Sequence, residues 1–176
     1  MQDIAVSYNK YKFIGNEFLT WLWFMMETDP DCFQDLTASL LIIGNRIQLE
    51  NTRENRTESI TIKGDDAGLE EGKLALQKGA QVTEMNLSVR LDEFLYKFTL
   101  KGESLSLSNL KLPDAQKEAQ ISETDEDFEA TVLDRMFFFE KIISFIDAVY
   151  ERFIRLRISD KWKDKVLGDM KRWIMT

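Results

Sequence analysis

The sequence predicts an α+β fold, in which an antiparallel meander sheet of about five to six strands packs against helices. The strand-like runs are short, alternate between apolar and polar residues, and follow each other closely along the chain. An apolar helix precedes them, and a long helical pattern followed by a shorter one comes after them. The chain has 176 residues, 44% of them hydrophobic and 31% charged, which fits one globular domain.

The first helix is expected in the stretch GNEFLTWLWFMMETD, which begins at Gly15. Asn16 can cap it, and Asp29 should end it, because a residue that precedes a proline avoids the helical region. The nearly uniform apolar surface predicts burial between the sheet and the long helix. The apolar run from Phe18 to Met26 is far shorter than the ~20 residues needed to span a membrane. The residues expected to lie deepest are Phe18, Leu22 and Met25 or Met26.

The strand segments are separated by glycine-containing turns. Gly44 and Asn45 lie between two β-prone runs and predict a hairpin with a two-residue turn. A short helix over 67–78 should interrupt the strands, with Leu69, Lys73, Leu74 and Leu76 as its partial inner face. Gly79 is placed to end that helix in the left-handed conformation. The expected strands are 39–43, 46–50, 59–63, 82–91, 94–100 and 104–108.

The domain is expected to span 1–176, with helix and sheet in 1–112, an acidic linker in 113–125 and a helical pair in 126–176 that packs on the sheet. The long helix should cover 126–157, and Ser159 can cap a last helix over 160–174. Intramolecular packing and coiled-coil-like dimerisation both remain open for the long helix. Its first apolar stripe, spaced 4-3-4-3-4-3, is Val132, Met136, Phe139, Ile143, Ile146, Tyr150 and Phe153. Its second stripe is Phe138, Ile142, Phe145, Val149 and Leu156.

No catalytic motif emerges, and we expect neither enzymatic activity nor a cofactor or metal. The chain has no histidine and a single cysteine, Cys32, which lacks a base to support its thiolate. A magnesium-dependent nuclease is a remote alternative. Asp31 after Pro30, with Glu71 and Lys73, matches a short pattern that can hold magnesium and activate water.

The charge is unevenly distributed. The net charge of −8 argues against a basic surface over the whole chain, whereas residues 151–176 contain eight basic and four acidic side chains. This segment is the sequence-based candidate for contacting the phosphates of double-stranded DNA, and a charge-balancing face is the alternative. The candidate DNA contacts are Arg152, Arg155, Arg157, Lys161, Lys163 and Lys165.

A second copy of the chain is the other expected partner, and a protein-interaction or oligomerisation module without DNA binding is an alternative function. The candidate interface residues are Trp21, Trp23, Phe138 and Phe145. No membrane contact and no small-molecule substrate are expected. A single cysteine and the absence of a signal-peptide pattern favour a cytoplasmic location.

Several segments resemble the C-terminal part of bacterial RdgC-type recombination-associated proteins. The sharpest match is EFLTWLW at 17–23, and LLIIGNRIQLEN, KGAQVTEMNLSV, LSLSNLKLP and LDRMFFFEKIISFIDAVYERFIRLRIS extend it over 13–173. The resemblance implies non-enzymatic, sequence-independent binding to double-stranded DNA as a dimer, restraint of the recombinase, and a place at the bacterial nucleoid. Family members carry an additional N-terminal half, and their DNA-binding features depend on an assembled ring, so no family DNA-binding residue is carried over.

Overall fold

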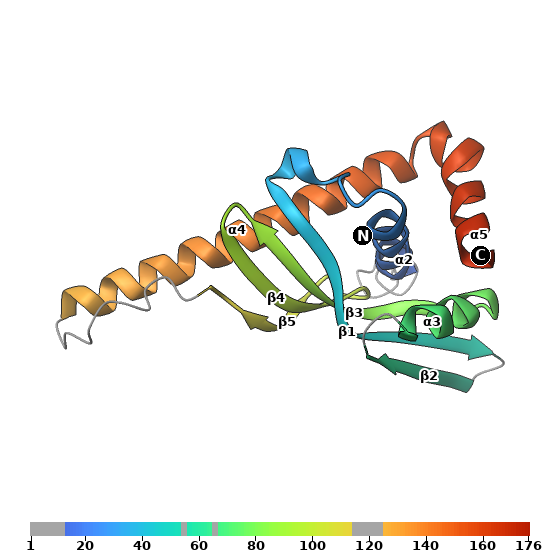
Figure 1. Ribbon diagram of the computed structural model, residues 1–176, viewed down its shortest axis with the longest axis horizontal. Helices are drawn as coiled ribbons and strands as arrows, with labels where there is room; N and C mark the ends of the chain where they lie inside the picture. Colours follow the sequence, from blue (N-terminus) through green and yellow to red (C-terminus); the bar gives the residue numbers. More distant parts are fainter. Residues whose placement is uncertain (1–12, 54–55, 65–66, 114–124) are drawn as a thin grey trace, which may run out of the picture.

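The computed structural model describes residues 13–53, 56–64, 67–113 and 125–176 (Figure 1). Helices cover one side of a single five-stranded sheet, and the longest helix runs across the whole molecule. In chain order the elements are α2 (Phe13–Thr28), η1 (Gln34–Leu36), β1 (Ala38–Arg53), β2 (Arg56–Lys63), α3 (Ala67–Gln77), β3 (Gln81–Leu91), β4 (Phe94–Lys101), β5 (Leu107–Lys111), α4 (Asp125–Arg157), η2 (Trp162–Val166) and α5 (Leu167–Met175).

The sheet confirms the predicted α+β fold. Its strands are antiparallel in the order β2-β1-β3-β4-β5. The strands β3, β4 and β5 follow one another as a meander, while α3 connects β2 to β3, so that β3 pairs with β1. The helices α2 and α4 pack on one face, and the buried hydrophobic residues form one cluster between them and the sheet.

The helix α2 lies between the sheet and α4, as predicted, and ends before Pro30. Phe18 and Leu22 are fully buried, and Phe18 contacts the rings of Tyr150 and Phe153 on α4. Two details of the prediction were wrong. Asn16 is inside the helix and does not cap it, and Met25 and Met26 are only half-buried, since Leu19, Trp21 and Trp23 fill the interior instead.

The predicted hairpin at Gly44 does not exist. β1 continues through this position, with a register shift against β3 between Ile43 and Ile47. The described glycines with left-handed φ are Gly64 and Gly79, so Gly44 does not adopt the turn conformation. A Cβ at Gly44 would lie 2.0 Å from Oδ1 of Asn86, so the glycine allows β1 to pass close to β3 at a bulge.

Two other elements differ in detail. β5 begins at Leu107 instead of Ser104, because Ser106 belongs to the turn and accepts a hydrogen bond from the Lys101 amide at 3.0 Å. In α3, Leu74 is 52% exposed, and the small residue Ala75 takes the inner position beside Leu76. Gly79 has a φ of 89° after α3, which confirms the predicted left-handed end of that helix.

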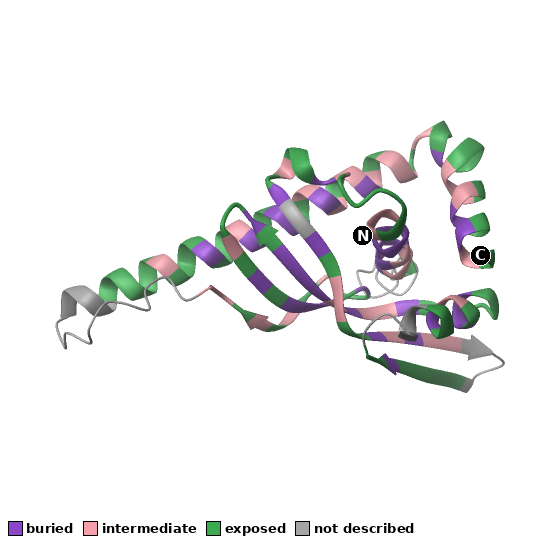
Figure 2. Cartoon of the chain, in the orientation of Figure 1, coloured by how far each residue is buried: buried purple, intermediate pink, exposed green. Residues whose placement is uncertain are grey.

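The long helix α4 is confirmed, but its two halves have different surroundings. From Phe138 onwards its inner face is buried in the core. Its first half extends past the sheet and is largely exposed (Figures 1 and 2). Packing against the described residues therefore accounts for the apolar stripes only in the second half of α4. The predicted acidic linker lies almost wholly outside the described residues.

The last helix, α5, folds back over the C-terminal end of α2. A turn at Ile158 and Ser159 separates it from α4, and the Ser159 hydroxyl donates to the Leu156 carbonyl at 2.7 Å. Glu27 of α2 accepts hydrogen bonds from the indoles of Trp23 at 2.6 Å and Trp173 at 2.8 Å. Lys73 of α3 lies 2.9 Å from the same carboxylate, so Glu27 joins α2, α3 and α5. None of the described helices is long and apolar enough to cross a membrane.

Candidate nucleic-acid interface

Three arginines of the predicted DNA-binding set are engaged in contacts within the chain. Arg152 pairs with Asp35 and donates to the Cys32 carbonyl, and its hydrogen bond holds the pKa of Asp35 below its usual value. Arg157 lies 2.8 Å from Glu17. These two side chains fasten α4 to α2 and to the loop that follows it, which gives them a structural role.

The third arginine, Arg155, and the three lysines of that set are at the surface. Arg155 forms an ion pair with Glu151 one turn earlier, at 2.6 Å. Lys161, Lys163 and Lys165 are exposed on the last helical segment, where Asp160 and Asp164 alternate with them. The structure therefore leaves three lysines of the predicted set accessible, on a helical segment where acidic side chains lie between the basic ones.

The four predicted interface residues are all buried inside the protomer. Trp21 and Trp23 are at most 1% exposed, and Phe138 and Phe145 are 5% exposed. Trp21 packs against the rings of Phe33 and Phe153 within its own chain. Their apolar surface is used in the core, so an interface between copies has to involve other residues.

A different basic surface lies on the face of the sheet opposite to the helices. Tyr96, Phe98 and Leu100 of β4 point into the core and are fully buried, so the alternate residues of this strand point outwards. Residues directly opposite each other on paired strands share a face, which extends this surface onto β3 and β5. We define the open sheet face as Glu84, Asn86, Ser88, Arg90, Leu95, Lys97, Thr99, Lys101, Ser108 and Lys111.

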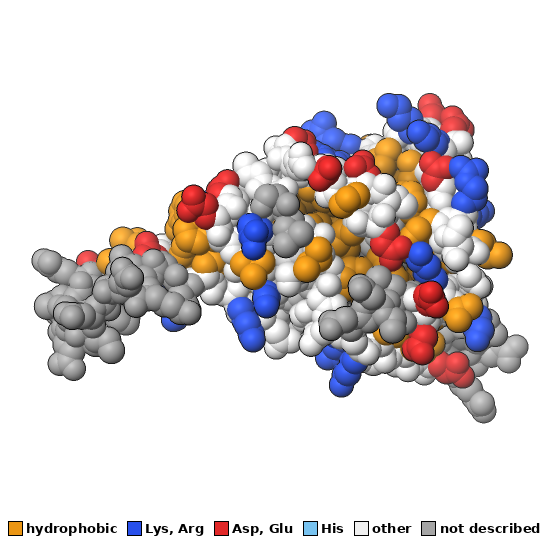
Figure 3. All heavy atoms as spheres, in the orientation of Figure 1, with side chains coloured by type: hydrophobic (Ala, Val, Ile, Leu, Met, Phe, Trp, Pro, Cys, Tyr) orange, Lys and Arg blue, Asp and Glu red, His pale blue; other side chains and the backbone are white. Residues whose placement is uncertain are grey.

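The open sheet face is cationic although the chain as a whole is acidic. It contains four basic side chains, Arg90, Lys97, Lys101 and Lys111, and one carboxylate, Glu84. That carboxylate is 3.5 Å from Lys101 and 4.0 Å from Arg46 of β1, so it is shared between two cations. Basic side chains are accordingly visible across the front of the sheet in Figure 3.

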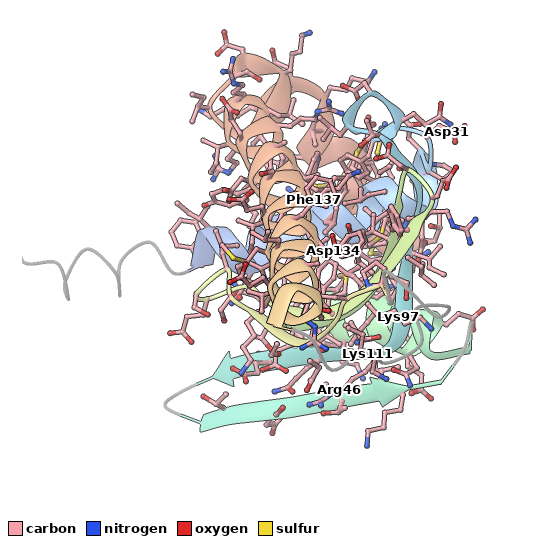
Figure 4. The ribbon with its side chains drawn as sticks, turned by 90° about the vertical axis from the view of Figure 1, so that its left-hand side faces the viewer. Asp31, Arg46, Lys97, Lys111, Asp134 and Phe137 are labelled. Atoms are coloured by element: carbon pink, nitrogen blue, oxygen red, sulfur yellow. The ribbon has the colours of Figure 1, made fainter. Side chains whose placement is uncertain are left out.

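Lys97 and Lys111 form a pair of neighbouring cations on this face. They are directly opposite each other on β4 and β5, and both are exposed (Figure 4). Like charges at opposed positions destabilise a sheet, so this pair creates a local positive potential that the fold itself does not need. Ser88 and Thr99 of the same face are buried, at 8% and 6% exposure, so the long exposed lysine side chains are the groups that a ligand can reach.

Sequence reasoning missed this surface because the basic residues are far apart in the chain and come together only through strand register. A signal was present within β4, where Lys97 and Lys101 alternate with buried aromatic and aliphatic residues. The partners on β3 and β5 could not be assigned without the pairing of Lys97 with Ser88 and Lys111.

The residues of the nuclease hypothesis do not form a site in the described part of the chain. Lys73 is paired with Glu27. Asp31 lies on the exposed loop after α2, which Figures 1 and 4 show apart from α3, where Glu71 is exposed. Among the described residues, no group of three or more acidic, cysteine or histidine side chains is arranged to hold a metal ion.

The surroundings of Cys32 make its thiol unreactive. Burial raises its pKa to about 12, and the neighbouring Asp29 adds to this shift. Because the thiolate is the nucleophile, alkylation by iodoacetamide at pH 8 should be at least about tenfold slower than for the same chain unfolded in urea. Mass spectrometry of timed samples measures both rates. Equal rates in the two states would contradict the burial of this side chain.

A scan against protein-family models finds no match for this chain, and a search of curated proteins finds none either. The function therefore rests on the residues, their geometry and the resemblance described above.

Proposed function

We propose that this protein is a non-catalytic, DNA-associated recombination accessory protein of the RdgC kind, which contacts the backbone of double-stranded DNA through the open sheet face. The observation that carries the proposal is the pair of exposed lysines, Lys97 and Lys111, opposite each other on a face of the sheet that none of the described helices covers (Figure 1). Such a protein would act at the bacterial nucleoid, in the cytoplasm.

Phosphate recognition suits the chemistry of this face better than base recognition. Lysine carries a point charge on a flexible stem, which neutralises phosphates without reading sequence. Ser108 on β5 is half-buried beside the lysines, and its hydroxyl can donate a further hydrogen bond to a phosphate oxygen. The whole chain has a net charge of −8, so the surface outside this face is acidic and would be repelled by DNA. The proposal therefore predicts binding through one face only.

Fluorescence anisotropy with two duplexes of unrelated sequence tests this proposal. We expect similar affinities for both duplexes at low salt. A plot of log K against log salt should fall with a slope of about −3 to −4, because about four phosphates are neutralised. No binding at 20 mM salt by the folded protein, or a strong preference for one duplex, would contradict it.

A further inference from the structure

The first half of α4 presents an apolar stripe that the described residues leave uncovered. Val132 is 39% exposed, Met136 57% and Phe139 49%, and Ile143 at the end of the stripe is half-buried. The spacing 4-3-4 is that of alternating d and a positions in a heptad, the pattern by which one helix packs against another.

The same stripe continues into the core. Ile146 and Phe153 lie on its extension and are buried, and Phe153 packs against Phe18 of α2. Among the described residues, this stripe therefore packs against another helix only along its second half. The first half extends beyond the sheet, where Figure 2 shows a mainly exposed surface.

The charged residues beside the stripe indicate what kind of helix would cover it. With Met136 at position a and Phe139 at d, Arg135 occupies position g and Glu140 the following position e. In a parallel two-stranded coiled coil, a g residue faces the e residue of the partner five positions later, so each Arg135 would face the partner's Glu140. An antiparallel pair would instead bring arginine to arginine and glutamate to glutamate.

We infer that two copies of this chain associate through a short, parallel, in-register coiled coil over residues 132–143. Met136 packs on the partner's Met136, Phe139 packs on the partner's Phe139, and two Arg135–Glu140 pairs flank them. Twelve helical residues span about 18 Å, so the dimer should be reversible and dependent on concentration. The two helices separate after Ile143, where each seam enters its own core. This inference stands independently of DNA binding.

Analytical ultracentrifugation of the full chain over a concentration series tests the dimer. Met136→Glu and Phe139→Glu should each raise the dissociation constant at least about a hundredfold, since they place a carboxylate in the seam. Leu74→Glu is the matched control. It replaces a leucine of similar exposure, 52%, on α3, and should leave the dissociation constant unchanged. Circular dichroism checks that all variants fold.

Charge exchange tests the parallel orientation. Arg135→Glu alone and Glu140→Arg alone each create like-charge pairs and should weaken the dimer about three- to tenfold, whereas the double variant should restore it. In a Cys32→Ser background, Met136→Cys should form an intermolecular disulfide on mild oxidation. In a parallel dimer, a residue at heptad position a faces the same residue of the partner. A monomeric wild type, a dimer insensitive to Met136→Glu, or a double charge variant as weak as the single ones would overturn the inference.

Discussion

The double substitution Lys97→Glu with Lys111→Glu should weaken binding to double-stranded DNA about tenfold to a hundredfold at low salt. Both side chains are exposed at opposed positions of β4 and β5, so the change replaces two cations of the proposed DNA-binding face with two anions. The salt slope should also become shallower by about 2, because each lost phosphate contact removes about one unit. Anisotropy titrations at four salt concentrations give the affinity and the slope together.

The matched control is the pair Lys161→Glu with Lys165→Glu, which makes the same charge change on the last helical segment. We expect this control to reduce affinity only through the net charge, by less than about threefold. If the control weakened binding more than the sheet variant did, the C-terminal helices would be the DNA-binding surface.

Folding should not confound this comparison. The wild-type lysines repel each other across the strand pair, and Lys97→Glu alone would replace that repulsion with an ion pair opposite Lys111. The single variant should therefore be at least as stable as the wild type. Thermal melts of the single and double variants would show whether any loss of DNA binding exceeds the loss of folded protein.

The sequence predicted the helices well because their signals are local. The apolar periodicity of α4, the proline after α2 and Gly79 after α3 each act within one or two turns of the chain. The prediction at Gly44 was wrong because a contact with a residue distant in the sequence, and not a local signal, determines the structure there. A Gly-Asn pair between two β-prone runs matches a hairpin turn, but the glycine is required by the close approach of Asn86, which is 42 positions away in the sequence.

The residues of the candidate site were harder to predict for the same reason. A cluster of arginines and lysines near the C-terminus suggested a phosphate-binding surface, yet Arg152 and Arg157 pair with Asp35 and Glu17, whose positions in space no periodicity can supply. The open sheet face, conversely, has no cluster in the sequence and depends on register. For α4 the stripe was correctly identified, and only the structure shows where the sheet stops covering it.

Gly15→Ala should destabilise the protein by about 3 kcal/mol, although alanine is normally favoured over glycine inside a helix by about 1 kcal/mol. A Cβ at Gly15 would lie 1.8 Å from the carbonyl oxygen of Gly102, a backbone atom in the turn after β4. A hydrogen bond of 2.8 Å from the Gly102 amide to the Thr83 carbonyl holds this turn in place. The helix and the sheet would therefore have to separate to make room for the methyl group.

Gly168→Ala provides the control with the opposite expected sign. Gly168 is also helical, but a Cβ there meets no atom within 4 Å, so alanine should stabilise the protein by about 1 kcal/mol. Urea unfolding followed by tryptophan fluorescence measures both changes. A Gly15→Ala variant as stable as the wild type would show that α2 does not pack this closely on the turn after β4. Because that turn directly follows Lys101, the close packing also sets where the open sheet face ends.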